Sequence, residues 1–487
     1  MKKVFAMLLA LMMLCTCTAL GEKSGNDLGV EFYNAGDYEQ ARIHFEQGAV
    51  EGDSYAMNNM GVLYENGDGV DQSYEEALAW YRKGAEAGCA EAMKNVGTFY
   101  ENGYAVEQDY LMARLWYEKA AELDNAAAMA HLGKLYMRDD LGYEPDAVKA
   151  VRWMEAAINK GHAECSVYEQ IGAIFYDGRG EVEKDVVKGV KYFEEAVRLD
   201  STYTYAYECL GHAYCKGEDG IEQDYVKGAA YLEKAVELGS AEAYVNEWLG
   251  VIYYDGRGGM EKDVVKAVKY LEEAVRLDST FTYAYECLGH AYCKGEDGIE
   301  QDHVKGAAYF EKALELGSTH LCAYEWLGVI YYDGRGGVEK DIVKAVKYFE
   351  EAVRLDSTYT YAYECLGHAY CKGEDGIEQD FVKGAASFEK AAELGSESAY
   401  VYEWLGQIYY DGQGGVEKDA AKGVAYFEKA AELGSMYAYA YDVLGYIYYG
   451  EHEGFVTDRE KGIAYYNKAV ELGSEYAQER LDEISSE

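Results

Sequence analysis

The chain has 487 residues, a formal net charge of −44 at pH 7 and one proline, Pro145. Hydrophobic residues make up 49% of it and 51 residues are tyrosines, so the acidity is not that of a disordered acidic tail. Binding to nucleic acid or to an anionic membrane surface needs a basic patch, and this charge balance argues against both. Cationic and neutral partners stay open, and the length allows several domains or one array of repeats.

The first 21 residues are predicted to be a signal peptide. Lys2 and Lys3 form a positive end, residues 4–16 form an apolar stretch too short to span a bilayer, and residues 19–21 (Ala-Leu-Gly) fit a cleavage site. The alternative is a lipoprotein signal, with Cys17 as the lipidated residue. Both predict a secreted or envelope-bound protein, and no later segment is apolar enough to cross a membrane.

The rest of the chain repeats itself. Residues 22–53 form a short first repeat, residues 54–162 hold units of about 36 residues, and residues 163–474 hold units of 39 residues. In this last part, pairs of units recur with a period of 78: the segment EWLGVIYYDGRGG begins at Glu247 and again at Glu325. Residues 475–487 are predicted to be a polar capping helix. About twelve tandem units of this length predict an all-α stack of repeats.

Each unit is predicted to contain two antiparallel helices. In the first helix of one unit, Ala206, Leu210 and Tyr214 follow one another at a spacing of four, which is typical of one helix face. The glycine beside the leucine, Gly211, has no side chain, so the partner helix can approach closely. The Gly-rich loop that follows supplies the turn.

The second helix of the same unit is predicted to begin after Asp224 as its N-cap and to end at Gly239. Tyr231, Ala235 and Leu238 are predicted to face inward. One such helix pair cannot bury its own apolar face, whereas stacked pairs can.

These motifs resemble the Sel-one-like repeat family, a relative of the tetratricopeptide repeats. The segments MGVLYENGDGVDQSYEEALAWYRKGAEAG and VGTFYENGYAVEQDYLMARLWYEKAAEL are similar to its pattern of Leu-Gly-x-x-Tyr, a Gly-rich loop, Asp and a Lys-Ala-rich second helix. The resemblance covers nearly the whole chain after the signal peptide. It implies a right-handed α-solenoid that acts as an adaptor or scaffold and is not an enzyme.

The resemblance also implies a groove lined by the first helix of each unit. Counted from the leucine of the unit, its lining positions are −5, −2, +2 and +5, which share one helix face. Position −2 is a carboxylate in steps of 39, at Glu169, Glu208, Glu247, Glu286, Glu325, Glu364, Glu403 and Asp442. In the first units Asn58, Lys94 and Ala130 interrupt this row. The predicted groove residues are Tyr205, Glu208, His212, Tyr244, Glu247, Tyr254, Tyr283, Glu286, His290, Glu325, Tyr332, Tyr361, Glu364, His368, Glu403, Tyr410 and Asp442.

An acidic trough lined with tyrosines suits a basic or extended polypeptide as partner. Tyrosine rings also stack on sugars, so a glycan is the second option. The alternative without a binding role is that the glutamates are solvated helix residues and the tyrosines fill gaps between helices, because a duplication preserves any row.

The segment CLGHAYCKGEDG occurs three times, beginning at Cys209, Cys287 and Cys365. Within one copy the two cysteines are six residues apart, about 9 Å along a helix and roughly 120° around it, so one helix cannot offer both to one zinc or join them in a disulfide. We expect free thiols carried along by duplication, with a metal-binding Cys/His protein as the least favoured alternative.

No sequence motif of a hydrolase, a phosphate-binding loop or a zinc protease occurs. The Gly- and acid-rich loops lack the spacing of a calcium loop. The sequence therefore predicts an exported, non-enzymatic scaffold without a cofactor.

Overall fold

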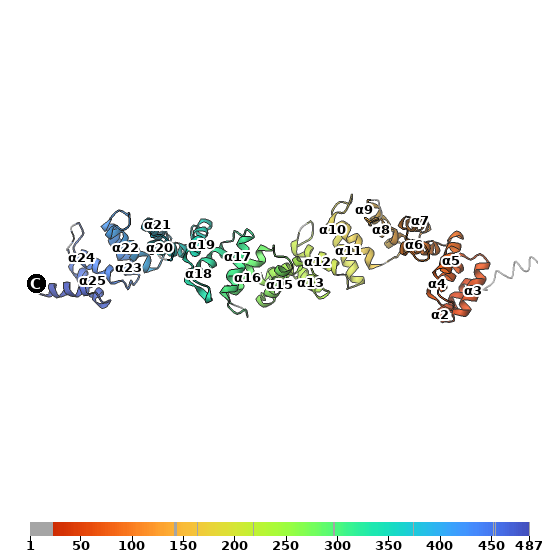
Figure 1. Cartoon of the computed structure of the whole chain (residues 1–487), viewed down its shortest axis with the longest axis horizontal. Coiled ribbons are helices and arrows are strands. Elements are labelled where there is room, and N and C mark those ends of the chain that lie inside the picture. The colour runs from red at the N-terminus through yellow and green to blue at the C-terminus, as the bar shows by residue number, and fades with distance from the viewer. Residues whose placement is uncertain are drawn as a thin grey trace, which may run out of the picture. The chain divides into compact units, whose positions relative to one another are not determined.

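The computed structural model describes residues 23–140, 144–162, 164–217, 219–295, 298–373, 375–450, 452 and 454–486. The predicted signal peptide and Cys17 lie outside these residues. Every regular element of the described residues is a helix, which confirms the predicted all-α fold (Figure 1). None of these helices is both long and apolar enough to span a bilayer.

The chain divides into two compact units, Met1–Ser240 and Ala241–Glu487. The helices of the first unit are α2 (Gly25–Asn34), α3 (Tyr38–Val50), α4 (Ser54–Asn66), α5 (Tyr74–Glu86), α6 (Ala90–Asn102), α7 (Tyr110–Glu122), α8 (Ala126–Tyr136), α9 (Ala147–Asn159), α10 (Cys165–Asp177), α11 (Val186–Leu199), α12 (Thr204–Lys216) and α13 (Tyr225–Glu237). The first pair, α2 and α3, falls on the predicted short repeat.

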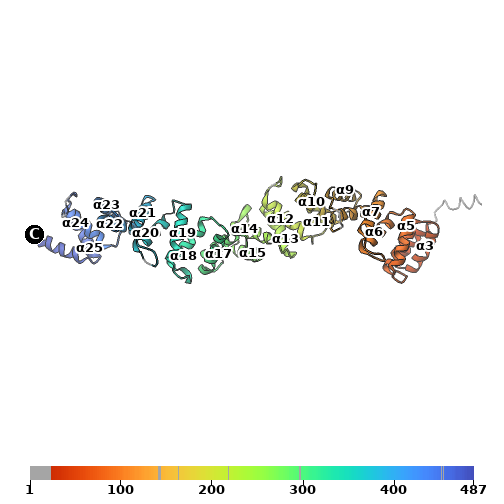
Figure 2. The same ribbon diagram turned by 45° about the horizontal axis from the view of Figure 1, so that its top comes forward.

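The helices of the second unit are α14 (Ala243–Asp255), α15 (Val264–Leu277), α16 (Thr282–Lys294), α17 (His303–Glu315), α18 (Leu321–Asp333), α19 (Ile342–Leu355), α20 (Thr360–Lys372), α21 (Phe381–Glu393), α22 (Ala399–Asp411), α23 (Ala420–Glu432), α24 (Ala438–Tyr449), α25 (Arg459–Glu471) and α26 (Glu475–Ser486). Two short 3-10 turns, η1 (Arg257–Gly259) and η2 (Arg335–Gly337), lie in loops. Within each unit, helix pairs follow one another in chain order, as both views show (Figure 1, Figure 2).

The ends of the helices follow from the sequence. The side chain of Asp224 accepts a hydrogen bond from the backbone N–H of Lys227 at 2.9 Å, so it is the N-cap of α13 as predicted. The first helix of that pair, α12, ends at Gly217, whose φ of +66° belongs to the left-handed region that favours glycine. The same two signals recur in most pairs and fix the length of the loop.

Close contact between the two helices of a pair depends on the glycine next to the leucine. A Cβ on Gly211 would lie 2.4 Å from Leu232 Cδ2, and a Cβ on Gly289 would lie 2.8 Å from Phe310 Cδ1. Leu232 is fully buried, as is Ala235. The prediction that Tyr231 and Leu238 face inward was therefore wrong by register: both are only half-buried, and the residue after the tyrosine fills the core.

A ladder of Glu, Tyr and Lys side chains joins successive pairs. At one rung, the Tyr292 hydroxyl and Lys305 Nζ donate to Glu272 Oε1 at 2.8 and 2.6 Å, and the lysine lies 4.0 Å from the centre of the tyrosine ring. The three residues come from α16, α17 and the preceding second helix, α15. The other complete rungs are Glu194–Tyr214–Lys227, Glu311–Tyr331–Lys344, Glu389–Tyr409–Lys422 and Glu428–Tyr448–Lys461.

The first helices form a separate layer. Within the second unit α14 contacts α16, α16 contacts α18, α18 contacts α20 and α22 contacts α24, in addition to the contacts of each with its own partner. Within the first unit α2, α4 and α6 are related in the same way, as are α8, α10 and α12. The side of the first helices that faces away from their partners is called the first-helix face below.

Candidate functional site

Three pockets lie on the first-helix face at the positions that the leucine offsets define. In the second unit, a pocket of about 420 Å³ is lined by Tyr410, Tyr439, Asp442, Val443, Tyr446 and Tyr476. A neighbouring pocket of about 320 Å³ is lined by Tyr400, Glu403, Trp404, Gln407 and Tyr437. We call them the C-terminal pocket and the Trp404 pocket. The structure thus brings the predicted residues Tyr410 and Asp442 together, and gives Glu403 aromatic neighbours.

The pocket of the first unit has a different charge. Its volume is about 510 Å³, and its lining includes Lys134, Arg138, Glu169, Arg179 and Tyr205. Each of the three cations has a carboxylate partner: Lys134 bonds Glu164, Arg138 bonds Asp140 and Arg179 bonds Asp177. Tyr205 is the one residue of the predicted groove that lines it.

Most carboxylates of the −2 row hold a serine at the end of the second helix of their own pair. The hydroxyl donors lie 2.5 to 2.7 Å away, in the pairs Ser240–Glu208, Ser318–Glu286, Ser396–Glu364, Ser435–Glu403 and Ser474–Asp442. Glu208 and Glu286 are only 6% and 8% exposed. These two side chains therefore offer little surface to a partner, whereas Glu364, Glu403 and Asp442 are half-buried and reachable.

The remaining row members alternate with these. Glu247 and Glu325 are half-buried, and each has an aspartate, Asp278 or Asp356, near the end of its pair's second helix. Burial, and then the negative charge of that aspartate, raises the pKa of both glutamates. Glu169 also has a pKa raised by burial. The 78-residue period thus separates two kinds of row carboxylate, one bonded to serine and one held beside a like charge.

The predicted histidines bond tyrosines of the preceding first helix. Tyr254 and the Nδ1 of His290 lie 2.6 Å apart, and Tyr332 and His368 form the equivalent bond. In the first unit Tyr176 and the Nδ1 of His212 lie 2.7 Å apart. Positions +5 and +2 of successive pairs are therefore engaged with each other.

The predicted tyrosines at −5 lie at the edge of the same face. The hydroxyls of Tyr205 and Tyr283 each point to an aspartate that ends the previous first helix, Asp177 and Asp255, at 3.4 Å. Tyr361 is 39% exposed. Tyr244, in the equivalent position of α14, is half-buried.

The repeated cysteines lie in the packed interior. Cys209 is 4% exposed, and Cys215 is fully buried, with its Sγ 2.4 Å from the place where a Cβ on Gly228 would lie. Burial raises the pKa of Cys209 to about 12, so its thiol is protonated at neutral pH. Among the described residues, no group of three His, Cys, Asp or Glu side chains could hold a metal ion.

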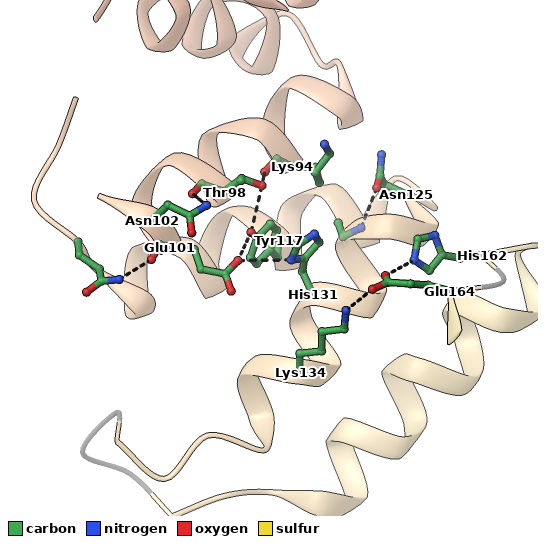
Figure 3. Close-up of polar contacts among 12 residues, drawn as sticks. Lys94, Thr98, Glu101, Asn102, Tyr117, Asn125, His131, Lys134, His162 and Glu164 are labelled. Carbon is green, nitrogen blue, oxygen red and sulfur yellow. Dashed lines mark hydrogen bonds and ion pairs between the residues drawn. The ribbon is translucent and has the colours of Figure 1, made fainter. Parts of the chain in front are cut away.

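A polar cluster occupies α6 to α8 in the first unit. The Tyr117 hydroxyl donates to Glu101 Oε2 at 2.5 Å, and His131 Nδ1 lies 3.4 Å from the same oxygen (Figure 3). Burial raises the pKa of Glu101, but the bonds from His131 and Tyr117 outweigh it, so the pKa is lowered. The carboxylate therefore ties three helices together as an anion.

A second carboxylate in this region, Glu164, bonds Lys134 at 2.6 Å and His162 at 3.0 Å (Figure 3). Burial opposes its ionisation, but bonds from Lys134, Ser166 and His162 lower its pKa to about 2. Here, too, a carboxylate fixes neighbouring segments.

Sequence reasoning missed four pocket residues that the offsets could have found. Tyr400 and Gln407 are at −5 and +2 from Leu405, and Tyr439 and Tyr446 are at −5 and +2 from Leu444. Tyr476 is five residues before Leu481, so α26 repeats the start of a first helix, which the interpretation as a polar cap concealed. The ladder glutamates also recur every 39 residues and were not recognised, because glutamate is common throughout the chain.

Comparison with known proteins gives a consistent result. The profile of the Sel1 repeat matches eleven segments, residues 54–89, 90–125, 126–162, 168–201, 205–240, 244–279, 283–318, 323–357, 361–396, 399–435 and 436–474. No curated protein sequence matches the chain.

Two solved structures are similar to it. A protective antigen present in uropathogenic Escherichia coli strains, which displays an SLR fold, is 25% identical with a TM-score of 0.46, over 96% of this chain and 94% of that chain. A Sel1 repeat protein from Oxalobacter formigenes is 30% identical with a TM-score of 0.40, over 52% of this chain and 97% of that chain.

Proposed function

The chain belongs to the Sel1 repeat family, whose members are generally scaffolds for protein–protein interaction, and we propose that it is an exported, non-enzymatic scaffold that binds a polypeptide on its first-helix face. The observation that carries the proposal is the pair of neighbouring pockets in the second unit. Both combine tyrosines with a reachable carboxylate of the −2 row, Asp442 in one and Glu403 in the other.

The chemistry of these pockets favours a basic segment. Tyrosine supplies a large, rigid contact surface and is enriched at protein interfaces. Carboxylates attract a cationic partner and speed its association. The aromatic residues that face outward on α22, Tyr400 and Trp404, would contact such a segment directly.

Export is supported by the basic and apolar start of the sequence. It implies a mature chain that begins near Glu22, or at a lipidated Cys17, and the mass of the protein isolated from its source distinguishes the two. An intact Met1 in that mass would contradict export.

Site-specific photo-crosslinking tests the binding face. A benzophenone amino acid replaces Tyr400, which is 40% exposed on α22, and in a separate variant replaces Val382, which is 54% exposed on the second helix α21. Each variant is expressed in the source organism and irradiated in intact cells. We expect a covalent polypeptide adduct at position 400 and none at position 382.

The controls separate the alternatives. An adduct whose extra mass is removed by glycosidase treatment would assign the face to a glycan. Adducts of equal yield at both positions, or none at position 400, would contradict a polypeptide-binding first-helix face.

A further inference from the structure

The C-terminal pocket has the composition of a site for an organic cation. Its lining contains four tyrosines from three helices: Tyr410 from α22, Tyr439 and Tyr446 from α24, and Tyr476 from α26. Val443 and Asp442 complete the lining, so the lining residues include one carboxylate and no basic side chain. Aromatic rings around a space of this kind attract cations through the negative charge of the ring faces.

The carboxylate in the pocket lacks a cation among its recorded interactions. Ser474 Oγ donates to Asp442 Oδ1 at 2.7 Å, and burial raises the pKa of Asp442 in spite of that bond. A second carboxylate lies next to the pocket, since Asp411 Oδ1 accepts the hydroxyl hydrogen of Tyr439 at 3.0 Å. A positive charge entering the pocket would offset the cost of burying Asp442.

The ladder of the same chain shows what such a group pairs with. Beside Tyr409 and Glu389, Lys422 Nζ lies 3.8 Å from the ring centre and bonds the carboxylate. Lys461 takes the same position over Tyr448, at 3.8 Å, and bonds Glu428. The fold thus uses tyrosine, carboxylate and alkylammonium as a matched set, and the C-terminal pocket presents the first two.

The size of the pocket fits the third. A volume of about 420 Å³ is in the range of small-ligand sites and admits a lysine or arginine side chain with its alkyl stem. The pocket also lies where the last complete pair meets α26, whose Tyr476 supplies one wall. No further repeat follows α26 in the described residues to cover it.

We propose that the C-terminal pocket binds the cationic side chain of a lysine or arginine in a partner polypeptide, held over Tyr410, Tyr439, Tyr446 and Tyr476 and paired with Asp442. The proposal rests on the proposed function in that it takes the partner to be a polypeptide. It names the class of residue that the partner inserts and the place where it is held.

The test uses small probes and the full mature chain. Saturation-transfer NMR measures binding of N-acetyl-lysine methylamide, of its neutral analogue N-acetyl-norleucine methylamide and of choline. We expect the lysine probe to bind with a dissociation constant on the order of millimolar and at least about fivefold more tightly than the norleucine probe. Choline measures whether a free quaternary ammonium ion is preferred.

Matched variants locate the binding. Asp442→Asn and Tyr446→Leu should each weaken the lysine probe about fivefold or more, whereas Tyr446→Phe, which keeps the ring, should retain it. Glu403→Gln is the control, because Glu403 occupies the same row position and bonds a serine in the same way but lines the Trp404 pocket.

Three results would overturn the proposal. Equal binding of the lysine and norleucine probes would make the pocket an apolar site. Tighter binding of choline than of the lysine probe would assign it to a free small cation. Equal losses in Asp442→Asn and Glu403→Gln would mean that only the total charge matters. Each result leaves the crosslinking test of the polypeptide-binding face standing on its own.

Discussion

Carboxylates at the same repeat spacing have opposite environments in this protein. Bonds from Lys305 and Tyr292 overcome the effect of burial and lower the pKa of Glu272. Burial and Asp278 raise the pKa of Glu247. A lowered pKa means that ionisation stabilises the fold, and a raised pKa means that ionisation destabilises it.

The two residues should therefore respond to the same substitution with opposite signs. At pH 7, Glu272→Gln should lower stability by about 1 kcal/mol, because it leaves Lys305 without its anion at a partly exposed site. Glu247→Gln should raise stability by up to about 1 kcal/mol, because it removes a charge that the fold disfavours. Thermal unfolding followed by circular dichroism at 222 nm measures both shifts in midpoint.

The pH dependence provides the internal check. The contribution of Glu272 is present above the unfolded pKa of glutamate, about 4.3, and is lost as the pH falls through its lowered folded pKa. The gain from Glu247→Gln should disappear as the pH falls below the raised pKa of Glu247. Glu273→Gln, at an exposed neighbour that pairs with Arg276, should change little. Shifts of the same sign for Glu247 and Glu272 at pH 7 would contradict this assignment.

At the scale of the helix pair, the glycine beside the leucine sets the distance between the two helices. A Cβ on Gly289 would lie 2.8 to 2.9 Å from three atoms of the Phe310 ring, which is fully buried. In the pair of α12 and α13 the same position faces Leu232 instead of an aromatic ring. The helix pair therefore tolerates different core residues only opposite a glycine.

Gly289→Ala should destabilise the protein, although the same change in an ordinary helix stabilises by about 1 kcal/mol. The clash with Phe310 costs about 1–3 kcal/mol by overpacking. The double variant Gly289→Ala/Phe310→Leu should recover part of that loss, because leucine already fills this place opposite Gly211. Chemical denaturation of the single and double variants measures both effects. A single variant that is more stable than the wild type would show that the helices can separate without cost.

At the scale of the whole molecule, the sequence predicts the fold because its signals are local and repeated. The N-cap aspartates, the left-handed glycines and the leucine–glycine pairs act within one unit, and tandem copies leave few other ways to pack them. The register error at Tyr231 arose where two neighbouring residues, Tyr231 and Leu232, both fit a helical period.

The candidate site could be predicted only in part. The offsets from the leucine found Tyr410, Glu403 and Asp442, but the exposed area of a carboxylate depends on contacts between elements far apart in sequence. Glu208 and Glu286 are buried against serines 32 residues later, which no helical period reveals. The wall that Tyr476 supplies depends on how α26 packs.

The burial of these two glutamates also decides which charges can be used to test the central claim, that the first-helix face binds a basic segment. The reachable row carboxylates are changed together in the variant Glu364→Gln/Glu403→Gln/Asp442→Asn, in which each amide oxygen can still accept the serine hydrogen bond. The control variant Glu315→Gln/Glu393→Gln/Glu432→Gln removes the same number of charges from second helices, where each glutamate is exposed and pairs with a lysine three residues before it.

The most direct measurement is the affinity of both variants for the peptide segment identified by crosslinking at position 400, at low and at moderate salt. The account predicts that the first-helix variant binds about tenfold more weakly than the wild type, that the control loses no more than about twofold, and that added salt weakens the wild type most. Equal losses in the two variants, or full affinity in the first-helix variant, would contradict it.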